Sequence, residues 1–151
     1  MNFKNPGVDQ PLFTELSSQQ VITQAEWNSW SKPDEGNLTD VFVHHAGKIR
    51  NQAWIYWLVK RHNLVRVPNP EPDAAFLNGL DWHPKVIAIA EFYGLYPLGR
   101  RGATVNFVSL RPDVRDTIAE MLRWLRAERY HLFALTPREL TSWRDFVRIH
   151  K

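Results

Sequence analysis

The stretch Gly47–Asn63, GKIRNQAWIYWLVKRHN, contains the longest uninterrupted apolar run in the chain, from Ala53 to Val59. At about 100° per residue, four side chains follow one line along a helix here: Arg50, Trp54, Trp57 and Arg61. The remaining faces are also largely apolar, and such a helix is enclosed by its neighbours or covered by a partner. We therefore expect a central helix over 48–62. Its tryptophans either pack in the core or a protein interface, or offer stacking surfaces to unpaired bases.

Length and composition predict one globular domain spanning 1–151. The chain has 151 residues, of which 44% are hydrophobic and 23% charged, which is ordinary for a folded domain. Pro68, Pro70 and Pro72 impose an extended connection, so a candidate internal boundary lies near 68–73. The chain has no cysteine, which excludes disulfides, cysteine nucleophiles and thiolate metal sites.

The sequence favours a cytoplasmic protein outside the membrane. No apolar run approaches the roughly 20 residues that cross a bilayer. The opening residues, MNFKNPGVDQPLF, lack the basic and then apolar pattern of a signal peptide.

The elements predict an α+β fold, mainly helical, with a small sheet. Alternating side chains indicate a strand over 103–110, and a second strand is expected at 131–135. The intervening helix, predicted over 113–129, is long enough for these two strands to pair in parallel. Pro97, Gly99 and Gly102 surround Arg100 and Arg101, which predicts a tight basic loop.

The other predicted elements flank these. Thr136 and Glu139 form a capping box at the start of a last helix, with Pro137 at its first position. Further helices are predicted at 17–30, 74–80 and 82–92, and a short strand at 64–67. Residues 39–45 fit either a strand or a helix, and we favour the helix.

Charge is distributed unevenly along the chain. The net charge is +3, and thirteen of the nineteen basic residues are arginine. Residues 1–47 carry two basic and six acidic side chains, whereas residues 100–151 carry eleven and six. Arginine suits bidentate contacts to phosphate or carboxylate better than lysine does.

A helix over 113–129 would gather like charges on one side. Projected at about 100° per residue, Arg111, Arg115, Arg126 and Arg129 fall together beside an apolar face. Like charges on one side repel, so this pattern indicates a compensating partner. The alternative is that the arginines follow the helix dipole, or pair with acids from residues 1–47.

These patterns favour a non-catalytic binding protein. The leading hypothesis is a protein that binds nucleic acid or a nucleoprotein complex through six arginines: Arg100, Arg101, Arg111, Arg115, Arg126 and Arg129. The alternative is an adaptor or complex subunit that binds a protein, through the arginines or through Arg50, Trp54, Trp57 and Arg61.

An enzyme is the third hypothesis, with histidines as the acid–base groups. Asp40 and His44 are spaced for one helical hydrogen bond, and Asp81 and His83 lie close in sequence, but neither pair exceeds an ordinary structural role. No nucleophile elbow, phosphate-binding loop, dinucleotide-binding motif or histidine-rich metal motif is present. The sequence therefore predicts no catalytic residue, metal or cofactor.

Overall fold

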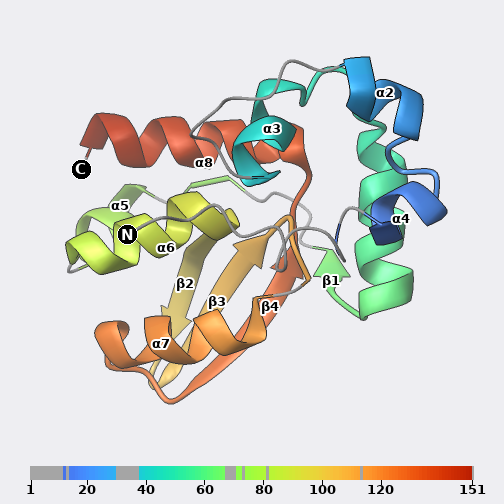
Figure 1. Cartoon of the computed structure of the whole chain (residues 1–151). Coiled ribbons are helices and arrows are strands. Elements are labelled where there is room, and N and C mark those ends of the chain that lie inside the picture. Colours follow the sequence, from blue (N-terminus) through green and yellow to red (C-terminus); the bar gives the residue numbers. More distant parts are fainter. Residues whose placement is uncertain are drawn as a thin grey trace.

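The chain folds as an α+β domain around a four-stranded mixed sheet (Figure 1). The computed structural model describes residues 12, 14–29, 38–66, 71–72, 74–80, 82–112 and 114–150. The strands are β1 (Val65–Arg66), β2 (Leu95–Arg101), β3 (Thr104–Ser109) and β4 (Arg129–Ala134), in the spatial order β1-β4-β3-β2. The expected strands at 103–110, 131–135 and 64–67 are thus confirmed, apart from their ends.

Helix α7 (Arg115–Leu125) connects β3 to β4, and the two strands pair in parallel as expected. β2 is an element that the sequence did not predict. It pairs antiparallel with β3, and its register shifts between Pro97 and Gly99. Proline and glycine are tolerated there because β2 is an edge strand with a bulge. The predicted basic loop is therefore the end of a β-hairpin.

The remaining labelled helices surround the sheet: α2 (Gln24–Ser29), α3 (Leu38–His44), α4 (Asn51–His62), α5 (Ala74–Asn78), α6 (Pro84–Tyr93) and α8 (Pro137–His150). The central helix is confirmed as α4. Gly94 ends α6 in the left-handed conformation, with φ +62°. The predicted helix at 17–30 is wrong, because residues 14–18 and 24–29 are separate helical segments with Gln20 at φ 59° between them. The candidate boundary at 68–73 lies largely outside the described residues.

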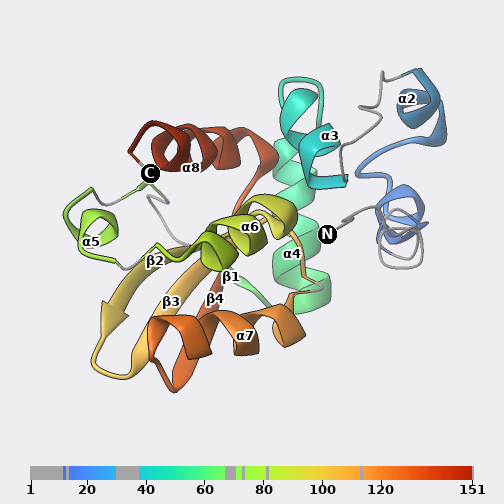
Figure 2. The same ribbon diagram turned by 60° about the vertical axis from the view of Figure 1, so that its left-hand side comes forward.

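Two hydrophobic cores lie on opposite faces of the sheet (Figures 1 and 2). On one face, α6 and α7 cover the inward side chains of β3, Val105 and Phe107. On the other face, α4 and α8 pack around Trp54 and Trp143. Because helices cover both faces, the described sheet itself is accessible at its ends and edges.

Polar side chains lock the helices into place. The predicted capping box of α8 is confirmed, since Thr136 and Glu139 each accept a hydrogen bond from the other's backbone N–H. Arg144, which is buried, donates to a carboxylate oxygen of Asp40 and to the carbonyl of Glu91, both at 2.7 Å. Tyr96 stacks near Trp143 with its hydroxyl buried and without a hydrogen-bond partner among the described residues.

Candidate interaction surfaces

The two tryptophans of α4 belong to the core. Trp54 is 0% and Trp57 1% exposed. The indole N–H of Trp54 donates to the carbonyl of Leu110 at 2.8 Å, and that of Trp57 donates to the carboxylate of Glu15 at 2.7 Å. The expectation that these rings form an interaction surface is therefore wrong, because the long apolar run of α4 is enclosed by the rest of the molecule.

The arginines on either side of these tryptophans make no shared surface with them. Arg50 is exposed and pairs with Glu26 at 2.7 Å. Arg61 is also exposed, near the other end of α4. With the rings between them buried, Arg50 and Arg61 do not form one aromatic and basic patch.

Arg111 does not lie on the surface. Its side chain is 0% exposed, its guanidinium lies 5.4 Å from the ring centre of Tyr93, and it donates weakly to the hydroxyl of Thr39 at 3.4 Å. The prediction that Arg111 contacts a partner is therefore corrected: its guanidinium is buried within the domain.

The predicted arginine face of a helix over 113–129 is also wrong. α7 ends at Leu125, and Arg126 adopts the left-handed conformation with φ 55°. Arg129 is already the first residue of β4. Of the four projected arginines, Arg115 alone is within α7, about 16 Å along the helix axis from Arg126.

A different arrangement brings four of the six predicted arginines together. The turn between β2 and β3, the end of α7 and the start of β4 meet at one end of the sheet, at the bottom of Figure 1. There, Arg101 pairs in register with Thr104, and Thr104 with Arg129. We call Arg100, Arg101, Arg126 and Arg129 the basic corner; all four are exposed.

The Arg100 side chain holds the basic corner together. Its guanidinium donates to the carbonyls of Leu125 and Arg126 at 2.7 and 2.8 Å, and its Nε donates to the carbonyl of Gly102 at 2.8 Å. These bonds satisfy carbonyls at the negative end of α7, where a cation is favourable. Arg129 donates to the hydroxyl of Thr104 at 3.4 Å.

No carboxylate among the described residues forms an ion pair with the basic corner. Glu128 lies between Arg126 and Arg129 in sequence, yet it is exposed and unpaired with them. The positive charge of this corner is therefore available to a partner.

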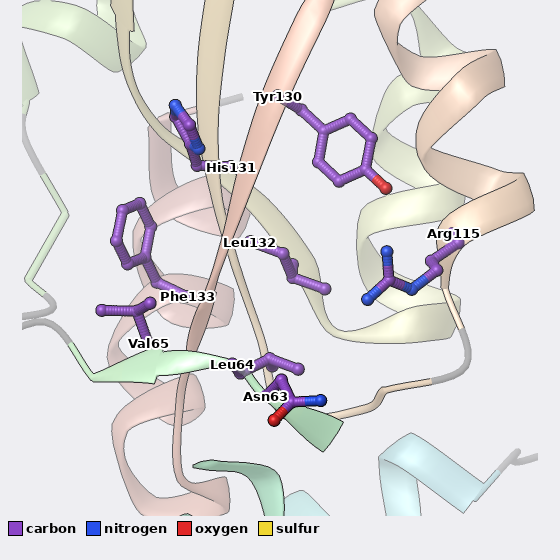
Figure 3. A pocket seen from close by; sticks show the side chains of 8 residues that line it. All are labelled: Asn63, Leu64, Val65, Arg115, Tyr130, His131, Leu132 and Phe133. Atoms are coloured by element: carbon purple, nitrogen blue, oxygen red, sulfur yellow. The ribbon is translucent and has the colours of Figure 1, made fainter.

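A pocket lies at the edge of β4 (Figure 3). It has a volume of about 320 Å³ and is lined by Asn63, Leu64, Val65, Arg115, Tyr130, His131, Leu132 and Phe133. Tyr130 and Leu132 lie on the same side of the strand as Arg115, whereas His131 and Phe133 lie on the other side. The pocket therefore wraps the strand edge and joins two faces of the sheet.

This edge was not predicted from the sequence. The strands expected at 64–67 and 131–135 differ in length by one residue, whereas β1 has two residues and β4 has six. β1 is therefore too short to cover β4. What the sequence could not show is that these two strands are adjacent.

A second pocket, of about 410 Å³, lies between α4, β1 and α8. Its polar centre is a bidentate ion pair in which Arg66 donates to both carboxylate oxygens of Glu139, at 2.7 and 2.8 Å. Burial acts to raise the pKa of Glu139, but the bonds from Arg66 and from the Thr136 backbone outweigh it and hold the pKa below its usual value. Because these charges are already paired, the pocket has no free charge to bind a ligand.

The histidines of the two predicted pairs, His44 and His83, make other contacts, and His62 pairs with Glu15 at 2.5 Å. His44 lies against His45 edge to face, while Asp40 binds Arg144. His83 caps α6 by accepting from the backbone N–H of Lys85, and it stacks on Trp124. Asp81 lies outside the described residues.

Among the described residues, no cluster of three or more histidine, aspartate or glutamate side chains has the spacing to hold a metal ion. Within the same residues, every helix is too short or too polar to cross a bilayer.

Comparisons with known proteins identify the fold and leave the family open. No protein-family model and no curated protein sequence matches the chain. Among solved structures, the N-terminal domain of XpsE is similar, with a TM-score of 0.55 and 11% sequence identity over 91% of this chain and 94% of that one. At this identity the likeness shows a shared fold alone.

Proposed function

We propose that this chain is a non-catalytic domain that binds an acidic surface of a partner protein through the basic corner. The observation that carries this proposal is the meeting of four exposed arginines from three separate segments, none of them in an ion pair with a carboxylate among the described residues. Planar guanidinium groups bind carboxylates in bidentate geometry. The similar structure of XpsE is itself one domain of a longer protein, so this fold occurs as a module.

Nucleic-acid binding is the second candidate, favoured by the same arginines. Two observations weaken it relative to a protein partner. Trp54 and Trp57 are buried and cannot stack on bases. Arg111 is buried and Arg115 is about 16 Å from Arg126, so the cationic surface is short for following a phosphate backbone.

A binding titration separates these candidates. The probes are a labelled decaglutamate peptide and labelled single- and double-stranded DNA and RNA, each at about 50 and about 200 mM salt. We expect the peptide to bind more tightly than any nucleic acid. Three phosphate contacts would weaken duplex binding roughly 40-fold between these salt concentrations, so a steep slope with DNA or RNA would favour the second candidate.

Matched variants test the location of binding. The combined changes Arg101→Ser, Arg126→Asn and Arg129→Ser remove three charges, and asparagine tolerates the left-handed conformation at 126. The control combines Lys48→Gln, Lys60→Gln and Arg138→Gln, which removes the same charge from exposed sites elsewhere. Equal loss of peptide binding in both variants, or no binding by the unchanged protein, would contradict the proposal.

A further inference from the structure

Within the described residues, one edge of β4 has a paired strand over only part of its length. β3 pairs with all of β4 on one side, from Arg129 to Ala134. On the other side, β1 reaches only Phe133 and Ala134. Within the described residues, no strand lies beside Arg129–Leu132 on that side.

The exposed edge offers backbone groups for pairing. The N–H groups of Arg129 and Leu135 donate toward β3, to Ala103 and Ser109. Backbone groups alternate between the two sides of a strand, so those of Tyr130 and Leu132 face the uncovered edge. An unpaired strand edge is a template for an added strand.

Positive charge beside this edge indicates which kind of segment would bind there. Arg115 lines the pocket from α7, is exposed, and has no carboxylate partner among the described residues. The side chain of Arg129 lies on the other face of the strand, where it donates to Thr104 of β3. One guanidinium group without a carboxylate partner, that of Arg115, thus flanks this edge, and a carboxylate is the protein group that complements it.

We propose that an extended, acidic segment of the partner protein adds to the sheet as a strand along the outer edge of β4. This inference rests on the proposed function and specifies the form of its partner. The added strand runs beside Tyr130 and Leu132, and its carboxylates, on the α7 face, meet Arg115. At about 3.3 Å per residue, a segment of roughly five residues covers the edge.

The pocket has room for side chains of that segment on both faces. Successive side chains of an added strand point to opposite faces of the sheet. Those on the α7 face reach Arg115, Tyr130 and Leu132, and those on the other face reach His131 and Phe133. Backbone pairing supplies affinity in this mode of recognition, and side-chain pockets supply specificity.

The test uses a labelled peptide of alternating glutamate and valine as the probe. Comparison peptides replace glutamate with lysine, or carry N-methyl groups that block one backbone edge. Affinity is measured by fluorescence anisotropy, and protection of individual amides by hydrogen exchange followed by NMR. We expect the glutamate peptide alone to bind, and the amides of Tyr130 and Leu132 to gain protection.

Variants of the protein locate the contact. Arg115→Glu should weaken peptide binding about tenfold or more, because a charged hydrogen bond is replaced by repulsion. Arg123→Glu makes the same charge change at an exposed position of the same helix and should have little effect. Tyr130→Pro removes an N–H that points to the outer edge and that β3 does not use. The variant should therefore still fold, but it should bind the peptide more weakly.

The outcomes separate this inference from the proposed function. Strand addition alone would be overturned by one combination of results. In it, decaglutamate binding depends on the basic corner, the Tyr130 amide gains no protection, and Arg115→Glu does not affect binding of the alternating peptide. Binding of nucleic acid but of neither acidic peptide would overturn both. Should Arg115→Glu fail to fold, protection of the Tyr130 amide in the unchanged protein still decides.

Discussion

Raising the pH should weaken this fold through one buried tyrosine. Tyr96 is 0% exposed, and burial raises its pKa to about 12, although the charges of Arg144 and Arg148 oppose that effect. In the unfolded chain the same phenol has its ordinary pKa of 10.0. Because the folded pKa is the higher one, the stabilisation is complete below about pH 10 and is lost as the pH rises toward 12.

The size of the effect follows from the two pKa values. At about pH 11 the unfolded phenol is mostly ionised and the folded one mostly neutral, which lowers the free energy of unfolding by about 1.4 kcal/mol. The folded and unfolded pKa of Tyr96 differ by about two, so the largest possible loss in the free energy of unfolding is about 2.7 kcal/mol. Tyr96→Phe removes the ionising group and should be free of this loss.

Urea unfolding at about pH 8 and about pH 11, followed by circular dichroism, measures this difference. At about pH 8 we expect Tyr96→Phe to be close in stability to the unchanged protein, because the buried hydroxyl makes no hydrogen bond of good geometry among the described residues, although Arg144 lies close enough to lower its pKa. An equal fall in stability for both proteins between these pH values would refute the reasoning. A solvent-accessible Tyr96 would also ionise near pH 10 in the folded protein, which absorbance at the phenolate band would reveal.

Three further outcomes test the packing. Trp54→Ala should lower the free energy of unfolding by about 4 kcal/mol or more, measured in urea, because it empties a core site and leaves the Leu110 carbonyl unpaired. Gly94→Ala should lower it by about 1–2 kcal/mol, since φ is +62° and the new Cβ would lie 3.0 Å from a methyl group of Leu140. The pKa of Glu139 is depressed, so its stabilisation is present above the usual carboxyl range and lost as the pH falls. Thermal unfolding between about pH 6 and about pH 3 should therefore show a smaller loss for Glu139→Gln than for the unchanged protein.

Local signals in the sequence were sufficient for most elements. The capping box at Thr136, the glycine that ends α6 and the alternation in β3 each have a cause within a few residues. The parallel pairing of β3 and β4 followed from the length of the connection between them.

The errors come from interactions between distant residues. Pro97 and Gly99 indicated a loop, but β3 holds them in a strand with a bulge. α7 ends at Leu125 without a glycine, since Arg126 itself takes the left-handed conformation and Arg100 caps the last carbonyls. Arg126 and Arg129 therefore lie beyond the end of α7, and a projection of residues 113–129 as one helix could not predict the basic corner.

Trp54 shows the same limit for the candidate site. Its position on one helical face with Arg50, Trp57 and Arg61 was predicted, but the sequence allowed these rings to be either buried or exposed. Trp54 is buried because its indole N–H donates to the Leu110 carbonyl, fifty-six residues away, inside the core.

The short β1 leaves part of the β4 edge open, and such an edge can pair with a second copy of the same chain as well as with a partner. A strand with an open edge is prone to pair with another copy of itself, which leads to aggregation. Arg115 beside that edge places like charges against each other whenever two copies approach it in the same way, and a flanking charge of this kind acts as a gatekeeper. The guanidinium group proposed to bind an acidic strand would thus also keep identical chains apart.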